Sequence, residues 1–357
     1  MTETGNEKHG ERAIACWKSP SNIALIKYWG KRGNQLPRNA SLSITLSNAY
    51  TVTRVEAAPL AQAGTGPEVE FRFEGEPNPA FAARIEKYLK QLTAYFDFLP
   101  DVKLLIETGN SFPHSAGIAS SASGMSALAL CLCSIEAQLK GQQEDDTFFR
   151  KASLISRLGS GSACRSVFGG ITVWGSHPAI AGSSDEYAVQ LDFELHPVFR
   201  GLMDAILIVH PGEKGVSSSK GHQLMEGHPY AEARFAHAAK NLSELAGVLK
   251  SGDWDTFAGI VENEALSLHA MMLTSSPWFM LMHPNSLMII NEIEKFRKQT
   301  GTKVCFTLDA GPNIHLLYPA DEAERVASLK ETLRPHCHNG VIIEDFMGNG
   351  PEKLSCR

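Results

Sequence analysis

The sequence predicts an α+β fold built of two lobes around a cleft. The chain has 357 residues, which is more than one hydrophobic core usually supports. Alternating segments typical of strands recur in both halves of the chain, and so do long apolar helical patterns. A polar stretch over residues 182–186 separates these halves. We therefore expect an N-terminal lobe over residues 1–198 and a C-terminal lobe over residues 199–357.

The N-terminal half combines strand-like alternation with one Ala- and Leu-rich stretch that is long enough for a buried helix. The expected elements are strands over 14–18, 50–57 and 102–108, and helices over 122–139 and 146–158. Asp145 or Asp146 is suited to cap the second helix, because a short acidic side chain accepts from free N–H groups of the first turn.

The C-terminal half alternates short buried strands with long helical patterns. The expected elements are strands over 205–210, 303–308, 314–318 and 341–346, and helices over 229–250, 253–273, 287–299 and 321–333. Gly301 is a suitable C-terminal cap, because glycine tolerates the left-handed backbone that ends many helices. This order indicates a second lobe of sheet and helices.

The composition is 43% hydrophobic and 20% charged, the balance of a soluble globular protein. A net charge of −6 and the lack of a basic run argue against a nucleic-acid or anionic-membrane partner. No apolar run approaches the roughly 20 residues that span a bilayer, and the polar N-terminus lacks the apolar core of a signal peptide. We expect a cytoplasmic protein that binds neither nucleic acid nor membrane.

Seven cysteines are scattered along the chain, and most lie in apolar segments. An odd number in such settings predicts reduced, buried thiols rather than a disulfide framework. The cluster His336-Cys337-His338 is too crowded for three side chains to converge on one ion. We therefore expect no metal held directly by protein ligands.

The first segment with site chemistry is the loop over residues 113–124, PHSAGIASSASG, which runs directly into the long helix. Free N–H groups and the positive end of the helix dipole make such a junction an anion site. Ser120, Ser121 and Ser123 add hydroxyl donors. It is not a Walker A loop, because no Gly-Lys-Ser/Thr ends it, and a loop that only caps its helix is the alternative.

The second segment, residues 156–166, reads SRLGSGSACRS. Its Gly-Ser-Gly-Ser portion lets the backbone and the hydroxyls of Ser160 and Ser162 approach an anion closely. Arg165 offers a planar fork for a carboxylate or a phosphate. A dinucleotide fingerprint would need glycine where Cys164 stands, so the remaining alternative is a structural turn between helices.

Two further segments place charged groups beside apolar strands. Lys27 and Lys31 flank Tyr28 in an apolar stretch, and a buried lysine requires an anionic partner. The alternative is that both amines reach the surface. Asp309 ends a buried strand and opens the turn Asp-Ala-Gly-Pro-Asn, which suits either a fixed catalytic carboxylate or a turn former.

Together these segments resemble the mevalonate-diphosphate decarboxylase family of the GHMP kinase superfamily. The matching blocks are, in the family's order, SPSNIALIKYWGK, GIASSASG, GSGSACRS and DAGPN. The resemblance covers about residues 14–318, and the KYWGK and GSGSACR blocks are specific to this branch. It implies the GHMP kinase fold, with two lobes of β-sheet and helices around the active-site cleft.

The resemblance implies an enzyme that uses ATP and Mg²⁺ to convert mevalonate 5-diphosphate to isopentenyl diphosphate, ADP, phosphate and CO₂. ATP phosphorylates the tertiary 3-hydroxyl, which turns a poor leaving group into a good one. Phosphate then leaves as the carboxylate is lost. The resemblance also implies a homodimer, with Mg²⁺ held through ATP rather than by protein ligands.

The resemblance further implies roles for single residues. Asp309 would orient the 3-hydroxyl and accept its proton, and Lys27 would neutralise the transferring phosphate and keep Asp309 ionised. Arg165 would hold the substrate carboxylate. The expected diphosphate contacts are Tyr28, Lys31, Ser160 and Ser162. The expected ATP-binding residues are Ser115, Gly117, Ser120, Ser121, Ser123, Ser218 and Ser219.

Two positions depart from the family pattern. His114 stands in the phosphate loop where a small or hydroxyl residue is usual, and Ser-Lys-Gly-His over residues 219–222 departs from the usual Ser-Thr-x-Gly-Met. The alternatives are a decarboxylase acting on mevalonate 5-phosphate, a 3-hydroxyl kinase that does not decarboxylate, and a noncatalytic small-molecule binder on the same fold.

Overall fold

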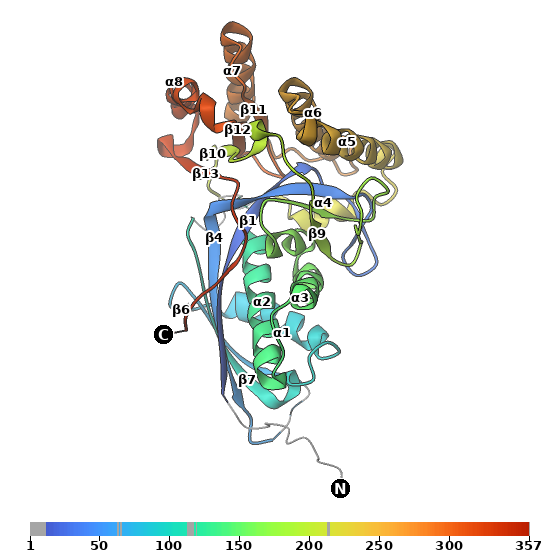
Figure 1. The fold of residues 1–357 in the computed structure, drawn as a ribbon, viewed down its shortest axis with the longest axis vertical. Helices are drawn as coiled ribbons and strands as arrows, with labels where there is room; N and C mark the ends of the chain where they lie inside the picture. The colour runs from blue at the N-terminus through green and yellow to red at the C-terminus, as the bar shows by residue number, and fades with distance from the viewer. Residues whose placement is uncertain are drawn as a thin grey trace.

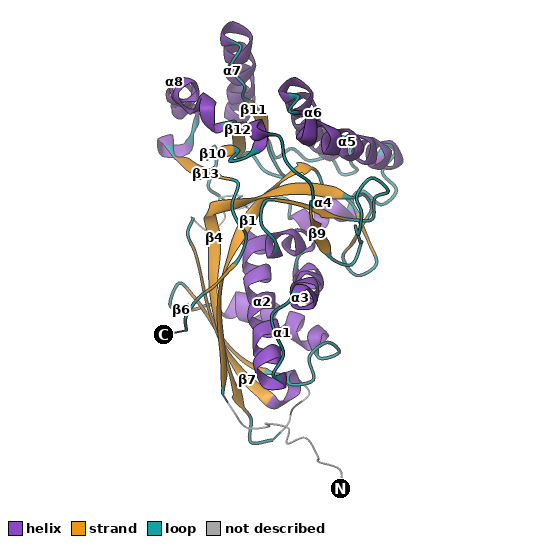
Figure 2. Ribbon diagram, in the orientation of Figure 1, coloured by secondary structure: helices purple, strands orange, loops and turns teal. Residues whose placement is uncertain are grey.

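The computed structural model describes residues 12–62, 64, 66–112, 118, 120–212 and 215–356. The molecule is elongated, with helices α1–α3 packed along a large sheet and helices α5–α8 gathered at the opposite end (Figure 1). The long strands β1 and β4 run between these two ends. Strands and helices are mixed in both parts (Figure 2), which confirms the predicted α+β class.

The large sheet has the order β14-β1-β4-β7-β5-β6, and β8 joins it through β4 and carries β9. Its strands are β1 (Ala13–Ile26), β4 (Ser41–Pro59), β5 (Glu68–Phe73), β6 (Glu76–Pro77), β7 (Val102–Asn110), β8 (Ile171–Trp174), β9 (Ala188–Gln190) and β14 (Glu352–Lys353). All of these pairings are antiparallel except β5 with β7. Because β14 pairs with β1, the last strand of the described chain returns to the sheet that contains its first strand.

Three helices cover one face of the large sheet, namely α1 (Pro79–Leu92), α2 (Ser120–Lys140) and α3 (Asp146–Gly159). The Asp145 side chain accepts from the N–H groups of Thr147 and Phe148, which confirms it as the cap of α3. Within the described chain, α2 is long and apolar enough to cross a membrane, but 78% of its apolar window is buried inside the protein. It is the central helix of this part of the molecule.

The smaller sheet has the antiparallel order β11-β12-β10-β13. Its strands are β10 (Met203–Leu207), β11 (Cys305–Thr307), β12 (Ile314–Tyr318) and β13 (Ile342–Phe346). The helices of this part are α4 (Ser218–Gln223), α5 (Ala231–Ser251), α6 (Trp254–Leu273), α7 (Pro284–Thr300) and α8 (Ala323–Leu333). The left-handed backbone of Gly301, with φ of 68°, ends α7 as predicted.

The predicted elements are present, and most boundaries differ by a few residues. The exceptions are the first two predicted strands, 14–18 and 50–57, which belong to the much longer β1 (Ala13–Ile26) and β4 (Ser41–Pro59). The polar turn after β1 contains a small hairpin, β2 (Lys31–Arg32) with β3 (Leu36–Pro37). The sequence prediction missed α1 and β5, which lie between the second and third predicted strands. Six of the seven cysteines are free and buried and Cys356 is free and exposed, so the prediction of reduced core thiols is confirmed.

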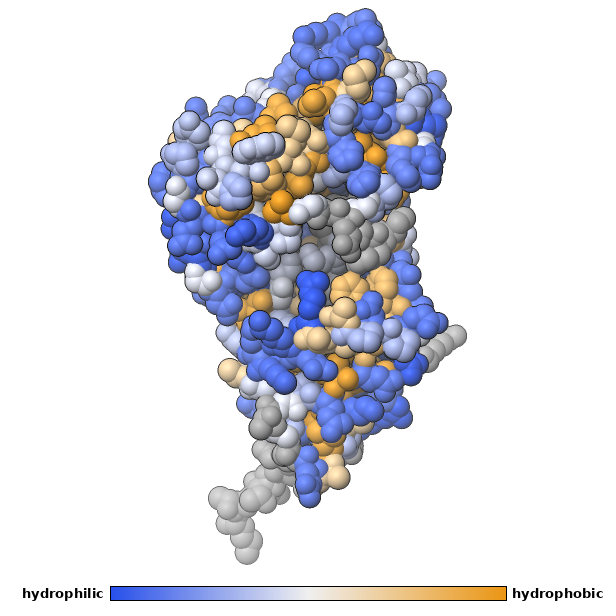
Figure 3. Space-filling model, turned by 180° about the vertical axis from the view of Figure 1, so that it is seen from behind, coloured by the Kyte–Doolittle hydropathy of each residue, from blue (hydrophilic) through white to orange (hydrophobic). Residues whose placement is uncertain are grey.

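The exposed surface is unevenly hydrophobic. Seen from behind, hydrophobic side chains gather across the part that holds helices α5–α8, while hydrophilic ones dominate elsewhere (Figure 3). Between α6 and α7, the side chains of Trp278 and Met280 are 69% and 58% exposed. Large apolar side chains left this open mark a surface suited to contacts with other molecules.

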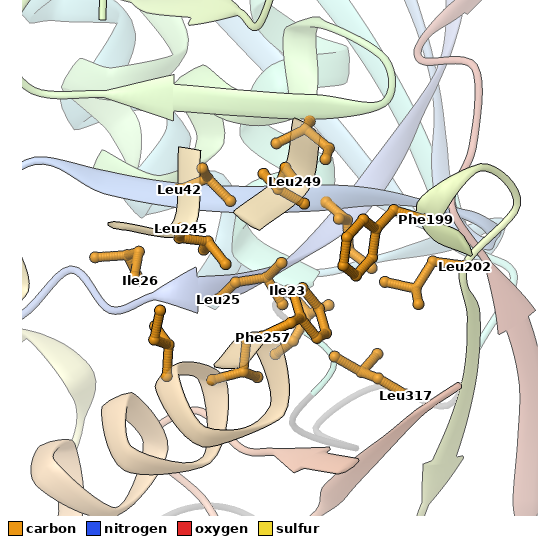
Figure 4. Packing of buried hydrophobic residues seen from close by; sticks show 14 of the residues in the cluster. Ile23, Leu25, Ile26, Leu42, Phe199, Leu202, Leu245, Leu249, Phe257 and Leu317 are labelled. Carbon is orange, nitrogen blue, oxygen red and sulfur yellow. The ribbon is translucent and has the colours of Figure 1, made fainter. Parts of the chain in front are cut away.

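One hydrophobic cluster joins strands β1 and β4 of the large sheet to helices α5 and α6 (Figure 4). Ile23 and Leu25 of β1 pack in one cluster with Leu245 of α5 and Phe257 of α6, and each is 2% exposed or less. Burying one such side chain contributes roughly 1.5–3 kcal/mol. The cluster therefore holds the end of β1, and with it Lys27, at the junction of the two parts.

Candidate active site

The centre of the candidate site is an ion pair between Lys27, directly after β1, and Asp309, just beyond β11. Lys27 Nζ lies 2.8 Å from Asp309 Oδ1, although 282 residues separate them in the chain. The Lys27 side chain is 2% exposed and that of Asp309 is 35% exposed. The amine is thus sealed inside the protein, and the carboxylate is partly exposed.

Lys27 is fixed at three points. Its amine donates to the carbonyl of Ala24 at 2.6 Å as well as to Asp309, and its backbone N–H donates to Glu264 at 2.9 Å. Burial lowers the pKa of Lys27, and the charge of Asp309 opposes that lowering. The expectation that the Lys27 amine is buried with an anionic partner is confirmed, and the surface alternative is wrong for this residue.

Glu264, on α6, anchors this arrangement from behind. Its carboxylate accepts from both terminal nitrogens of Arg234, at 3.1 and 2.6 Å, and from Asn241 at 2.7 Å. The side chains of Glu264 and Arg234 are 0% and 3% exposed. A buried charge needs such pairing and hydrogen bonding to be tolerated, so the network serves to hold the backbone of Lys27.

Arg165 lies in the 3-10 helix η2 (Gly161–Val167) and is 2% exposed. Its guanidinium donates to the hydroxyls of Ser43 and Ser41, at 3.0 and 2.7 Å, and to the Asn22 side-chain oxygen. These partners are all neutral. Burial lowers the pKa of Arg165, with opposing contributions from the charge of Asp309 and other groups. Arg165 is therefore a preoriented cation suited to an anionic ligand.

The Gly-Ser-Gly-Ser turn lies against Tyr28. A side chain at Gly161 would come within 3.0 Å of the Tyr28 ring and hydroxyl and 2.9 Å of Trp174, so only glycine allows this approach. The Tyr28 ring packs on Trp174 with centroids 4.6 Å apart. Ser160 caps the start of η2, and the carbonyl of Ser162 accepts from Asn22 at 3.3 Å. The structure thus brings this turn, Tyr28 and Arg165 together.

Lys31 lies on the β2–β3 hairpin, where its amine donates to the neutral side chain of Gln35 at 3.0 Å. It lines a pocket of about 700 Å³ between this hairpin and α4. Ser219, in the first turn of α4, lines the same pocket. The other charged side chains of its lining are those of Arg32, Arg38, Lys220 and the acidic Glu226, so basic groups outnumber acidic ones. Ser218 begins α4 and is exposed. The pocket is suited to an anion.

A second pocket, of about 260 Å³, opens at the N-terminus of α2. Its lining includes the apolar side chains of Phe71, Phe73, Phe81 and Ile85 together with Ser120, Ser121 and Gly124. The hydroxyl of Ser121 lies 3.4 Å from that of Ser160. An apolar, ring-lined wall next to hydroxyls at a helix N-terminus suits a molecule with a flat base and phosphates.

One residue that was predicted to contact ATP, Ser123, is buried in the protein instead. Ser123 is fully buried, and its hydroxyl bonds to Thr51 at 2.7 Å and to the carbonyl of Ser120 at 3.3 Å. It supports α2 from inside and does not line the pocket, which corrects the expectation that it contacts ATP. Ser115, Gly117 and His114 lie outside the described residues.

Sequence reasoning missed several groups that shape the site. Glu264 and Arg234 occur in helical patterns where charged residues usually face solvent, so nothing in their surroundings in the sequence distinguishes them. The neutral cradle of Arg165 was also missed. Asn22 lies inside the recognised block SPSNIALIKYWGK, and Ser41 and Ser43 follow it in the chain. Their positions at inward-facing strand sites could have indicated a buried polar partner.

Comparison with known proteins places the chain in a family. A family model for the diphosphomevalonate decarboxylase-like N-terminal domain matches residues 19–187, and one for the mevalonate 5-diphosphate decarboxylase C-terminal domain matches residues 205–351. The chain belongs to the diphosphomevalonate decarboxylase family. The diphosphomevalonate decarboxylase of Eremothecium gossypii is 35% identical over 334 residues, which is 88% of this chain and 79% of that protein.

Solved structures of the family have the same fold. The mevalonate diphosphate decarboxylase of Staphylococcus aureus is 28% identical, with a TM-score of 0.83 over 97% of this chain and 99% of that chain. A complex of MDDEF with MVAPP, AMPPCP and magnesium is 28% identical, with a TM-score of 0.82 over 97% of this chain and 100% of that chain. The GHMP kinase fold expected from the resemblance is confirmed.

Proposed function

We propose that this protein is an ATP-dependent diphosphomevalonate decarboxylase of the mevalonate pathway of isoprenoid biosynthesis. It would convert mevalonate 5-diphosphate to isopentenyl diphosphate, with ADP, phosphate and CO₂ as the other products. The observation that carries the proposal is the Lys27–Asp309 ion pair, 2.8 Å long, in a member of this family. A buried amine paired with a partly exposed carboxylate in a cleft is typical of a catalytic site and is not needed by a noncatalytic binder.

The chemistry assigns a task to each charged group. Asp309 orients the 3-hydroxyl and accepts its proton as the oxygen takes the γ-phosphoryl group of ATP. Lys27 keeps Asp309 ionised and stabilises the charge of the transferred phosphate. The C–O bond to this phosphate then breaks, and the electrons of the breaking bond to the carboxylate form the new double bond as CO₂ leaves. Arg165 holds the carboxylate in place until that step.

The remaining contacts follow the two pockets. Tyr28, Lys31, Ser160 and Ser162 hold the substrate diphosphate. The base of ATP lies in the ring-lined pocket, and its phosphates pass Ser120 and Ser121 at the N-terminus of α2. Ser218 and Ser219 approach the ATP phosphates from α4. Mg²⁺ is usually bound through substrate phosphates rather than by an all-protein cage. Here Mg²⁺ would be held through ATP beside the hydroxyls of Ser120 and Ser121, and it would supply positive charge that offsets part of the phosphate charge.

We further propose that the protein acts as a homodimer in the cytoplasm. The exposed apolar side chains of the α6–α7 segment, including Trp278 and Met280, support a subunit contact. The buried free thiols support a reducing compartment. Light scattering on the purified protein tests the first point, since a mass near 38.9 kDa would mean a monomer.

The function is tested by incubating the purified protein with ATP, Mg²⁺ and mevalonate 5-diphosphate while ADP and CO₂ are measured together. We expect equal amounts of both products. ADP without CO₂ would indicate a kinase of the 3-hydroxyl. Turnover of mevalonate 5-phosphate alone, measured in parallel, would move the protein to a decarboxylase of the monophosphate. If neither substrate gave ADP or CO₂, only the binding-protein alternative would remain.

A further inference from the structure

His222 stands in α4 at a point where this chain departs from the family's Ser-Thr-x-Gly-Met pattern. Its ring lies between two aromatic side chains of the predicted diphosphate-binding segment. The ring centroids are 4.3 Å from Tyr28 and 4.6 Å from Trp29. A side chain at Gly221 would come within 2.5 Å of the Trp29 ring, so α4 packs tightly against this segment. A residue of α4 is thus inserted next to Tyr28.

The same histidine holds the backbone of the segment. The N–H of Gly30 donates to His222 Nδ1 at 2.9 Å, and the carbonyl of Gly30 accepts from the N–H of Arg38 at 3.2 Å. Gly30 has φ of +95°, and a side chain there would come within 2.9 Å of the Phe235 ring. The chain therefore turns at Gly30 in a conformation that needs glycine. This turn, fixed at both polar groups, sets where Lys31 lies relative to Tyr28.

The hydrogen bond also defines the chemical form of the ring. Burial and the neighbouring charge of Lys31 lower the pKa of His222 to about 3, so the ring is neutral at physiological pH. Because Nδ1 accepts from Gly30, the proton of the neutral ring is on Nε2. His222 lines the basic pocket together with Lys31 and Lys220. A neutral ring adds no charge to that pocket, and it fixes the segment that carries Lys31.

We propose that His222 is a positioning residue for the substrate diphosphate, acting through its Nδ1 bond to Gly30 rather than through its packing against Tyr28 and Trp29. This inference rests on the proposed function, because Tyr28 and Lys31 act as diphosphate contacts only if the substrate is a diphosphate. The methionine that the resemblance leads us to expect at this position has no nitrogen that could accept this hydrogen bond. The ring connects the backbone of Gly30 to α4, so loss of the acceptor would loosen the segment that carries Lys31.

Three variants separate the hydrogen bond from the packing. His222→Phe keeps a ring between Tyr28 and Trp29 but loses the acceptor. His222→Asn keeps an acceptor near the Nδ1 position but loses the ring, and His222→Met removes the acceptor with the residue of the family pattern. His228→Phe is a matched control. Like His222, His228 accepts a backbone hydrogen bond at Nδ1, here from the N–H of Tyr230 at 3.1 Å. Unlike His222, it lines neither pocket of the site.

We expect His222→Phe and His222→Met to raise KM for mevalonate 5-diphosphate about tenfold, the effect of one net hydrogen bond. KM for ATP and kcat should stay within about threefold, His222→Asn should recover most of the affinity, and His228→Phe should leave KM unchanged. A wild-type KM in both acceptor-free variants would overturn the proposal. So would an equal rise in His228→Phe, or an equal loss in His222→Asn.

A binding measurement tests the role of His222 independently of the proposed function. Calorimetric titration with inorganic diphosphate measures the anion site without any turnover. Wild-type protein that binds diphosphate about tenfold more tightly than His222→Phe, yet turns over no substrate, would contradict the proposed function and support the positioning role. Equal binding by the two proteins would contradict the positioning role, whatever the activity.

Discussion

Replacing Glu264 by glutamine neutralises the carboxylate that holds the backbone of Lys27 and pairs with Arg234. The fully buried carboxylate accepts four hydrogen bonds of 2.6–3.1 Å, two of them from Arg234. Glutamine offers one oxygen and turns an NH₂ group toward other donors, so Arg234 keeps a buried charge without its counterion. Breaking a buried pair in this way costs about 3–5 kcal/mol, a large part of a typical stability of about 5–15 kcal/mol.

The assay is thermal unfolding combined with steady-state kinetics. An unfolding entropy of about 2.1 cal/mol/K per residue gives about 0.75 kcal/mol per kelvin for 357 residues. The variant should therefore melt about 4–7 °C below wild type and lose kcat, because Lys27 is no longer held. Glu294→Gln is the control, since Glu294 and Lys298 form an exposed pair on α7. If the two variants melted alike, the role given to the buried network would be wrong.

Four further predictions concern the site itself. Replacing Arg165 with lysine should lower kcat/KM about 10- to 150-fold, because lysine cannot reproduce the planar fork; kinetics with the diphosphate substrate test this. Ser121→Ala should raise KM for ATP severalfold and leave KM for the second substrate unchanged. Gly161→Ala should displace Tyr28, costing about 1–3 kcal/mol of stability and raising KM for the diphosphate, as melting and kinetics would reveal. Burial lowers the pKa of Lys27, so activity that needs the charged amine should fall at a lower pH than the ordinary 10.5 as pH rises. Asp309 opposes that lowering, so in Asp309→Asn the alkaline limb of the kcat profile should move to still lower pH.

Each of these has a result that would count against it. Full activity of Arg165→Lys would mean that no carboxylate is held there. A change in both KM values for Ser121→Ala would indicate a general disturbance rather than a nucleotide contact. Wild-type stability and KM of Gly161→Ala would mean that the turn accommodates a side chain without displacing Tyr28. If the alkaline limb of the kcat profile stayed at the same pH in Asp309→Asn, the titration of Lys27 could not be the cause of that limb.

The elements with strong local signals were predictable. Apolar periodicity and caps such as Asp145 and Gly301 depend on neighbours in the chain, so α3 and α7 can be assigned from the amino-acid sequence alone. Helix α1 was missed although Asn78 caps it and Pro79 starts it, a signal that pattern reading can recover. The division into lobes at residue 198 stays a prediction. The pairing of β14 with β1 was not predictable, because β14 has only two residues and its partner lies far away in the sequence.

The site was predictable where its residues belong to compact motifs. Lys27, Arg165 and Asp309 were all selected from short segments, and the structure brings their charges together. Glu264 was not selected, because a charged residue in a helix looks the same whether it faces solvent or a buried arginine. Its role follows from contacts across 237 residues of chain with Lys27. Ser123 shows the opposite error, since a hydroxyl in a phosphate loop can face the core instead of the ligand.

The measurement that tests the central claim most directly is the release of ADP and CO₂ by wild type and by Asp309→Asn under the same saturating conditions. We expect wild type to form both products from mevalonate 5-diphosphate in equal amounts. The folded variant should form both at least about a hundredfold more slowly, the lower end of what a positioned general base contributes. Near-wild-type release of CO₂ by the folded variant would contradict the assignment of Asp309, and with it the proposed mechanism.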